Sequence, residues 1–287
     1  MSQAIKATLS AKDHSRDSAG YTYVYPVFSR RAKGLSIGIN LNPNNACNWR
    51  CIYCQVPNLV RGGAPAIDLD LLNKELRALL YDVAHTTFLA DRLPPEAQRI
   101  NDIALSGNGE PTSAKSFDTV IQIVISAMTD FNLASKIKLI LITNGSLAQR
   151  TVVKRGLQLM AKNNGEVWFK LDSATNQGMR EINGSELGIR RAYQNLVTTA
   201  QLCPTWLQTC IFQRDGAHPP EHERQAYLNF IEKLVAARIP LRGALIYGLA
   251  RPSMQPQAAR LKSAELKWLE NFALDIQARG LPAEVHG

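Results

Sequence analysis

The sequence predicts an α/β protein built on a parallel sheet. Six short apolar runs stand out, several of them rich in Ile, Val or aromatic residues, as is typical of strands buried in a parallel sheet. Helical patterns lie between these runs, and a repeated strand–helix–strand order predicts right-handed crossovers. An eight-stranded barrel would need more chain than these elements leave. The predicted strands are residues 35–41, 102–106, 137–142, 166–172, 207–212 and 242–247.

The segments between the strands predict amphipathic helices. Their apolar residues recur every three or four positions, so each set falls on one face of a helix. Gly- and Pro-rich stretches at 61–65, 217–220 and 249–260 predict loops. The three clearest helical sets are Leu69, Leu72, Leu76, Leu79, Leu80 and Val83; Val120, Ile121, Val124 and Met128; and Tyr227, Phe230, Ile231 and Leu234.

The composition favours a soluble, basic protein. No apolar run approaches the ~20 residues that span a bilayer, and residues 1–19 lack the apolar segment of a signal peptide. We therefore expect a cytoplasmic protein without a membrane partner. The net charge of +9 can favour encounter with RNA or another polyanion, but the charges are dispersed, and ordinary solvated surface is the preferred explanation for them. The basic clusters are Arg30, Arg31 and Lys33; Lys154 and Arg155; and Arg190 and Arg191.

Three cysteines just after the first predicted strand are the main chemical signal. They read Cys47-Asn48-Trp49-Arg50-Cys51-Ile52-Tyr53-Cys54, with three and then two residues between the thiols. A short loop with this spacing can turn three thiolates toward one point. Such a set suits an iron–sulfur cluster in which one iron has no protein ligand and is open to chemistry.

Zinc and structural cysteines are the alternatives for this loop. Zinc in proteins usually takes four ligands, in Cys pairs often combined with His, and no second pair follows at zinc-finger distance. Cys203 and Cys210 lie about 150 residues downstream, and we expect both side chains to be buried among apolar residues. Three unrelated buried thiols are the remaining explanation for Cys47, Cys51 and Cys54.

The cysteine spacing, with an aromatic residue before the third Cys, resembles the radical S-adenosylmethionine (SAM) superfamily. The surrounding segments resemble its uncharacterised iron–sulfur oxidoreductase branch, which is grouped with the wyosine-tRNA-type radical SAM proteins. The resemblance covers roughly residues 25–248. It rests on Tyr25-Pro26-Val27-Phe28-Ser29-Arg30-Arg31, Leu35-Ser36-Ile37-Gly38-Ile39-Asn40, Ser106-Gly107-Asn108-Gly109-Glu110-Pro111-Thr112 and Ile142-Thr143-Asn144-Gly145-Ser146.

This resemblance implies a fold, two cofactors and a reaction. The fold would be the partial (β/α)6 TIM-like barrel of the radical SAM type, with a core domain over residues 25–248. A loosely attached extension, residues 1–24, would precede it, and a C-terminal loop and helix, residues 249–287, would follow. Cys47, Cys51 and Cys54 would hold a [4Fe–4S] cluster. An electron donor such as flavodoxin or ferredoxin would reduce it, and cleavage of SAM would give a 5′-deoxyadenosyl radical that abstracts hydrogen from an unidentified substrate.

Polar groups follow the carboxyl ends of the predicted strands, where parallel α/β folds build their sites. By resemblance, the loop of Gly107, Asn108, Gly109, Glu110 and Pro111 contacts the SAM amino group. We expect its glycines to let the backbone approach a ligand, so that Gly109→Val weakens SAM binding and leaves the cluster intact. Further candidates for SAM or substrate contacts, drawn from the cysteine loop and the strand ends, are Tyr53, Thr143, Asn144, Lys170, Asp172, Ser173, Gln213, Arg214 and Tyr247.

Several of these candidates have a structural alternative. Tyr53 would flank the adenine of SAM by resemblance, or simply pack in its loop. Asp172 would bind a ribose hydroxyl, or cap the next helix. Strand alternation turns Lys170 and Asp172 to the same side, where they are expected to pair with each other.

Two other classes of protein remain open at this point. A non-catalytic iron–sulfur redox protein would bind the cluster without productive SAM binding. An RNA-binding zinc protein would bind metal and RNA without iron. RNA also remains a candidate substrate, because of the basic balance and the wyosine-type resemblance.

Overall fold

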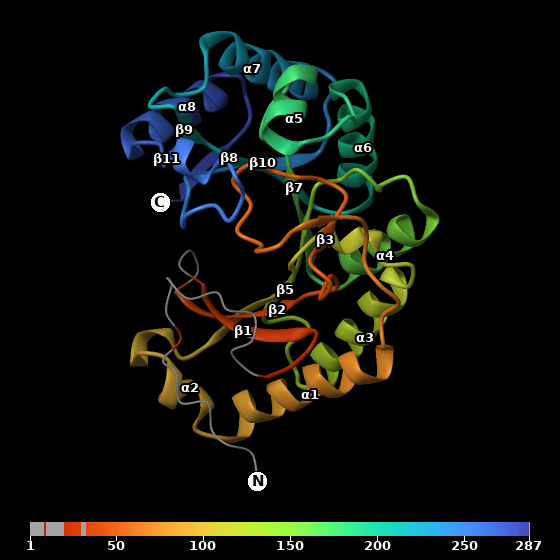
Figure 1. The fold of residues 1–287 in the computed structure, drawn as a ribbon. Coiled ribbons are helices and arrows are strands. Elements are labelled where there is room, and N and C mark those ends of the chain that lie inside the picture. Colours follow the sequence, from red (N-terminus) through yellow and green to blue (C-terminus); the bar gives the residue numbers. More distant parts are fainter. Residues whose placement is uncertain (1–8, 10–19, 30–32, 287) are drawn as a thin grey trace.

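An open, curved sheet organises the chain (Figure 1). The computed structural model describes residue 9, residues 20–29 and residues 33–286. In these ranges eight strands form one sheet in the order β1-β2-β5-β6-β7-β8-β10-β12. The first pair is antiparallel and every later pair is parallel. The strands are β1 (Val24–Ser29), β2 (Gly34–Ile39), β5 (Ile100–Leu105), β6 (Lys138–Thr143), β7 (Gly165–Lys170), β8 (Thr205–Cys210), β10 (Leu241–Tyr247) and β12 (Ala283–His286).

The six predicted strands are confirmed as β2, β5, β6, β7, β8 and β10, each displaced by no more than two residues at either end. They are neighbours in chain order, as a partial barrel requires. The predicted extension of residues 1–24 lies largely outside the described residues, and Arg30 and Arg31 lie there as well.

Two edge strands were not expected. Among the described residues β1 pairs with β2 alone, and an edge position tolerates Pro26 because proline has no N–H to donate to a second neighbouring strand. β12 pairs in parallel with β10, in a stretch where the sequence predicts only a loop and a helix. Its four residues are too few to produce a strand pattern.

Helices cover the outer face of the sheet (Figure 1). Asp68 caps the first of them by accepting a hydrogen bond from the Leu71 N–H at 3.0 Å. The apolar faces predicted for three helices are buried, apart from Leu69, which is partly buried. None of the helices in the described ranges is both long and apolar enough to cross a bilayer. The helices are α1 (Leu69–His85), α2 (Phe88–Arg92), α3 (Phe117–Asp130), α4 (Thr151–Lys162), α5 (Asn176–Asn183), α6 (Ile189–Leu202), α7 (Glu221–Ala236) and α8 (Leu266–Ala278).

Short elements complete the fold around the strand ends. β3 (Ala46–Cys47) pairs with β4 (Val60–Arg61), and β9 (Phe212–Arg214) pairs with β11 (Leu261–Ser263). Single turns of 3-10 helix are η1 (Pro95–Ala97), η2 (Pro111–Ser113) and η3 (Ala258–Arg260).

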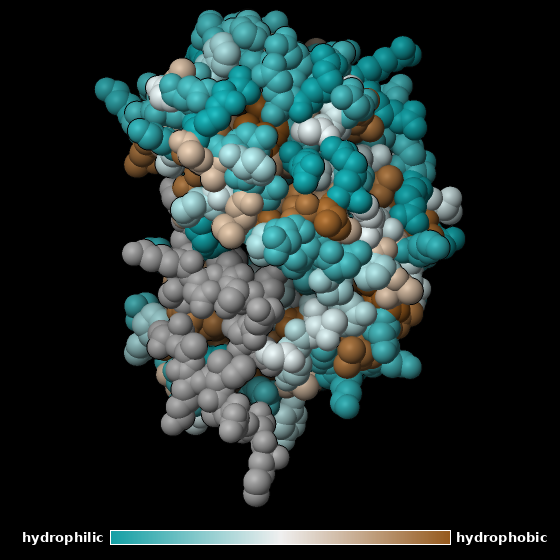
Figure 2. Space-filling model, viewed as in Figure 1, coloured by the Kyte–Doolittle hydropathy of each residue, from teal (hydrophilic) through white to brown (hydrophobic). Residues whose placement is uncertain are grey.

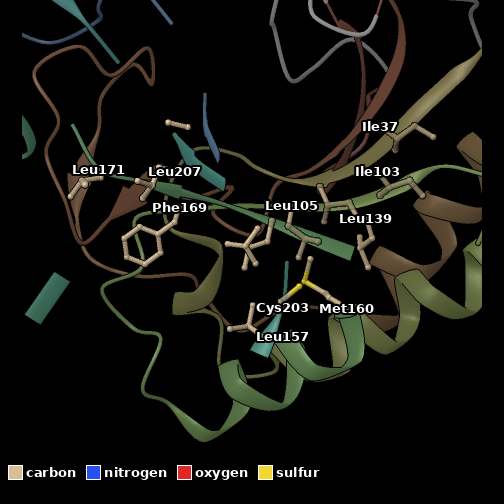
Figure 3. Close-up of a cluster of buried hydrophobic side chains, with 14 of the residues drawn as sticks. Ile37, Ile103, Leu105, Leu139, Leu157, Met160, Phe169, Leu171, Cys203 and Leu207 are labelled. Carbon is tan, nitrogen blue, oxygen red and sulfur yellow. The ribbon is translucent and has the colours of Figure 1, made fainter. Parts of the chain in front are cut away.

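Strand alternation separates a core from a cavity. Ile103, Leu105, Leu139, Phe169 and Leu207 point from the sheet toward the helices and form the core with residues of α4 (Figure 3). Cys203 lies buried among these apolar side chains, as the sequence predicts. The face drawn in Figure 2 is mostly hydrophilic, with apolar residues in small separate patches. The alternate residues of the strands face the inside of the curve.

Candidate functional site

A cavity of about 400 Å³ occupies the inside of the curved sheet; we call it the main cavity. Its walls are the inner faces of the parallel strands, the cysteine loop and the loop after β5. The predicted site residues that line it are Cys47, Cys51, Tyr53, Cys54, Gly107, Asn108, Gly109, Glu110, Asn144, Lys170 and Tyr247.

The other predicted residues lie elsewhere. Pro111 and Thr143 are buried behind the cavity wall. Asp172, Ser173 and Arg214 line a second cavity, of about 290 Å³. Ser173 donates a hydrogen bond to Glu223 on α7 at 2.7 Å. Arg214 forms an ion pair with Glu181 at 3.0 Å, and Gln213 donates to Glu265 at 2.8 Å.

The end of α5 holds the first half of the cysteine loop. The backbone N–H groups of Arg50 and Ile52 donate to the carbonyls of Asn183 and Ile182, each at 2.8 Å. Gly184 ends the helix in the left-handed region at φ 58°, and a Cβ there would lie 3.0 Å from the Cβ of Arg50. This close approach requires glycine, so the sequence of the helix end fits the cysteine loop.

A loop from the other end of the chain holds the second half. Ser253 Oγ donates to the carbonyl of Ile52 at 2.7 Å, and Gln255 Nε2 donates to the carbonyl of Val56 at 2.9 Å. The Met254 N–H donates to the carbonyl of Cys54 at 2.9 Å. The cysteine loop is therefore fixed on both sides by segments distant in sequence.

The three thiols line one cavity but differ in their surroundings. The Cys47 sulfur accepts a hydrogen bond from the Trp49 N–H at 3.4 Å, and the Cys51 sulfur accepts one from Asn183 Nδ2 at 3.3 Å. Burial raises the pKa of the Cys47 thiol to about 11 and that of Cys51 to about 12. In the described ranges, no three His, Cys, Asp or Glu side chains form a group that encloses a metal position.

The glycines of the loop after β5 are required by protein packing. A Cβ on Gly107 would lie 2.3 Å from Asn40 Oδ1, and a Cβ on Gly109 would lie 2.0 Å from the carbonyl oxygen of Ala46. Both positions face the segment that leads into Cys47. A side chain at position 109 would therefore meet Ala46, the residue before Cys47, and the expectation that Gly109→Val leaves the cluster intact stays a prediction.

Glu110 ties this loop to the end of β6. Its carboxylate accepts hydrogen bonds from Thr143 Oγ1 at 2.6 Å, from the Asn144 N–H at 2.7 Å and from the Thr112 N–H at 3.0 Å. Burial raises the pKa of Glu110, although these hydrogen bonds oppose the shift. The residue thus positions two loops of the cavity wall, and much of its accepting capacity is already used.

Asp172 links the two cavities. It accepts hydrogen bonds from the Tyr53 hydroxyl, from Asn183 Nδ2 at 2.7 Å and from the Cys210 N–H at 2.9 Å. It does not cap α5, because the capping side chain is Thr175. Its bond to Tyr53 ties the end of β7 to the cysteine loop, and the Tyr53 ring packs 5.6 Å from that of Phe212.

Lys170 has a different partner from the one that alternation predicts. Its ammonium donates to the Tyr247 hydroxyl at 3.1 Å and lies 5.0 Å from the centre of the Tyr53 ring. Asp172 lies two residues beyond Lys170, where β7 ends, so the regular alternation no longer holds there. The predicted Lys170–Asp172 ion pair is therefore not formed between these two described residues.

Sequence reasoning missed four polar residues that build the site. Gln208 follows the strand alternation that placed Lys170 inside, so that signal was available. Asn183 precedes Gly184, a pair that signals only a helix end. Ser253 and Gln255 lie in a predicted loop, where nothing in the local pattern marks them as partners of the cysteine loop.

Comparison with known proteins gives two partial sequence matches. No protein-family model matches the chain. A stretch of 132 residues is 30% identical to the GTPase Obg of Brachyspira hyodysenteriae and covers 46% of this chain and 17% of that protein. A stretch of 161 residues is 29% identical to the UPF0026 protein MJ1312 of Methanocaldococcus jannaschii and covers 55% of this chain and 42% of that protein. The matches thus span less than half the length of these curated relatives.

One solved structure matches almost the whole fold. The chain superposes on a radical SAM methyltransferase from Sphaerobacter thermophilus with a TM-score of 0.60 at 11% sequence identity. The superposition covers 92% of this chain and 68% of the methyltransferase. The predicted fold is confirmed: the chain has the radical SAM fold, an open parallel barrel whose cysteine loop follows its first parallel strand.

Proposed function

We propose that the chain is a radical SAM enzyme that acts on an unidentified substrate. Cys47, Cys51 and Cys54 would hold a [4Fe–4S] cluster, and SAM would bind in the main cavity. The observation that carries this proposal is that three thiols and the loops after β5 and β6 line one cavity at the carboxyl ends of the parallel strands. When bound, the cluster and SAM would supply one-electron cleavage of SAM to a 5′-deoxyadenosyl radical.

The donor set of the cysteine loop suits iron. All three candidate ligands are sulfur, and two of them accept N–H hydrogen bonds, which stabilise thiolate charge. Because burial holds the pKa of Cys47 and Cys51 at about 11 and about 12, both thiols keep their protons near neutral pH. Metal binding would therefore release protons from this loop.

Unpaired polar atoms in the main cavity suit SAM and a substrate. Asn108 Oδ1 and Gln208 Oε1 are buried and accept no hydrogen bond among the described residues. Lys170 supplies a cation in the same cavity. A ligand with an amino group and a carboxylate, such as SAM, would pair with groups of both kinds.

The proposed function also implies binding partners. A small one-electron donor such as flavodoxin or ferredoxin would reduce the cluster. RNA remains a candidate substrate, and membership of the wyosine-type branch remains a proposal. The fold supports neither of them. Lys33 directly precedes β2, at the end of the strand opposite the cysteine loop, and Arg190 and Arg191 lie in α6. These clusters do not line the main cavity.

Anaerobic reconstitution tests the proposal against its competitors. We expect about four irons per chain and, after reduction with dithionite, release of 5′-deoxyadenosine and methionine from SAM. Iron binding without SAM cleavage would support a redox protein. Zinc in place of iron would support a zinc protein and overturn the proposal. Deuterium transfer from labelled extracts into 5′-deoxyadenosine would then identify the substrate pool.

A further inference from the structure

Asn183 is the side chain that connects the end of α5 to a candidate cluster ligand. It is the last residue of the helix and is only 1% exposed. Its Nδ2 donates to Asp172 Oδ2 at 2.7 Å and to the Cys51 sulfur at 3.3 Å. An amide nitrogen carries two hydrogens, so both bonds can exist together.

The orientation of this amide is fixed from two directions. Asp172 also accepts hydrogen bonds from Tyr53 and from the Cys210 N–H, so its carboxylate cannot turn away. The backbone carbonyl of Asn183 accepts the Arg50 N–H at 2.8 Å, which holds the helix end against the cysteine loop. The hydrogen that faces Cys51 is therefore held in place before any cofactor binds.

Cys51 differs in this respect from the other two thiols. Cys47 receives its hydrogen bond from a backbone N–H, and the Cys54 sulfur accepts none within the described residues. Within the described part of the chain, the hydrogen bond to Cys51 is the one of the two that comes from a side chain, so a substitution can remove it.

We propose that Asn183 is a positioning residue that raises the reduction potential of the cluster through its hydrogen bond to Cys51. The inference rests on the proposed function. When the cluster takes up one electron from its donor, negative charge on the ligating sulfurs increases. A fixed N–H stabilises that added charge and so favours the reduced cluster.

The substitution Asn183→Leu tests this role. Leucine matches asparagine in shape but has no N–H, and Asp172 keeps Tyr53 and the Cys210 N–H as donors. Reconstituted variant and wild type are titrated with dithionite while the reduced cluster is followed by electron paramagnetic resonance. We expect the midpoint potential of the variant to fall by ~59 mV. This shift corresponds to about a tenfold lower ratio of reduced to oxidised cluster at the same solution potential.

Asn195→Leu is the matched control. Asn195 is fully buried, and among the described residues its amide nitrogen donates to the carbonyls of Gly145 and Ser146. Its loss should lower stability without moving the potential. A wild-type potential in Asn183→Leu at full iron content would overturn the inference, whereas absence of iron from the wild type would overturn the proposed function instead. If Asn183→Leu does not fold, Asn183→Ala removes the same donor and carries the same two outcomes.

Discussion

Lys170 and Gln208 are paired in register on β7 and β8, and both side chains line the main cavity. Burial alone would lower the pKa of Lys170, but Tyr247 and Asp172 raise it well above its ordinary value, so its ammonium stays charged. Beside it, Gln208 Oε1 is buried and accepts no hydrogen bond among the described residues. The Lys170 ammonium thus lies beside an acceptor, Gln208 Oε1, that has no hydrogen bond. Leaving this buried acceptor unsatisfied costs stability, and a polar molecule bound in the cavity could satisfy it.

Replacement of Gln208 by leucine should stabilise the apoprotein. An unsatisfied buried polar group costs about 1–3 kcal/mol, and leucine removes it at similar volume. We expect a higher thermal midpoint for Gln208→Leu, measured by calorimetry on the cofactor-free chain. Gln255→Leu is the control, because Gln255 is buried with hydrogen bonds to Cys54 and Val56, and its loss should lower the midpoint. A lower midpoint in both variants would contradict this account of Gln208.

The three loop cysteines should each be necessary for iron. Cys47→Ala, Cys51→Ala and Cys54→Ala are expected to lose the cluster after anaerobic reconstitution, since three ligands leave no protein thiol to spare. Cys203→Ala and Cys210→Ala should retain it, because Cys203 is buried in the apolar core and Cys210, although it lines the main cavity with Cys51, lies outside the three-cysteine loop. Iron content and visible absorption measure the outcome. A wild-type iron content in Cys51→Ala would contradict the assignment of Cys51 as a ligand.

Gly109→Ala should reduce iron loading as well as SAM binding. The added Cβ would lie 2.0 Å from the Ala46 carbonyl oxygen and 2.7 Å from Asn42 Cγ, so the segment leading into Cys47 must move. Gly63→Ala is the control, with its nearest contact at 3.3 Å to Ser113 Cβ. Iron per chain and SAM affinity by calorimetry separate the two effects. Normal iron with weakened SAM binding would show that the loop contacts the ligand first.

Glu110 should impose a pH dependence on stability. Because its pKa is raised in the folded chain, its contribution is fully present below the unfolded pKa and is lost as pH rises through the folded pKa. As pH rises above about 4, the apoprotein should therefore lose stability relative to Glu110→Gln. Urea unfolding of both chains across this range measures the difference. Parallel curves would show that the carboxyl group titrates normally.

An RNA substrate would produce a steep salt dependence. Each neutralised phosphate releases condensed counterions, so affinity for total tRNA should fall strongly from low to physiological salt. Filter binding at several salt concentrations gives the slope. Affinity that is absent at low salt, or insensitive to salt, would leave a small molecule or a protein side chain as the favoured substrate.

Local patterns in the sequence predict much of the fold. The parallel strands are short apolar runs because helices cover their outer face, and alternation within β7 sends Val167 and Phe169 outward. The same alternation turns Trp168 and Lys170 into the main cavity. The edge strands escaped prediction because β1 contains a proline and β12 is only four residues long.

Local patterns cannot predict the contacts that shape the site. Tyr53 and Asp172 are 119 residues apart, and Asn183 and Cys51 are 132 residues apart. No periodicity links such pairs, because tertiary packing alone brings them together. Gly109 shows the same limit: its motif indicates a close approach, but only the fold shows that the approach is to Ala46.

The hydrogen bonds from Ser253 and Gln255 to the cysteine loop can form only late in translation. These residues reach back 201 and 199 positions to Ile52 and Val56. A nascent chain therefore exposes its thiols long before their backbone is fixed. At about 5–20 residues per second, the delay is roughly 10–40 s, during which the thiols are open to oxidation and wrong metals. We therefore expect the cluster to be inserted after residues 253–255 have been synthesised. A chain on a ribosome stalled before residue 253 would have a cysteine loop that lacks these hydrogen bonds.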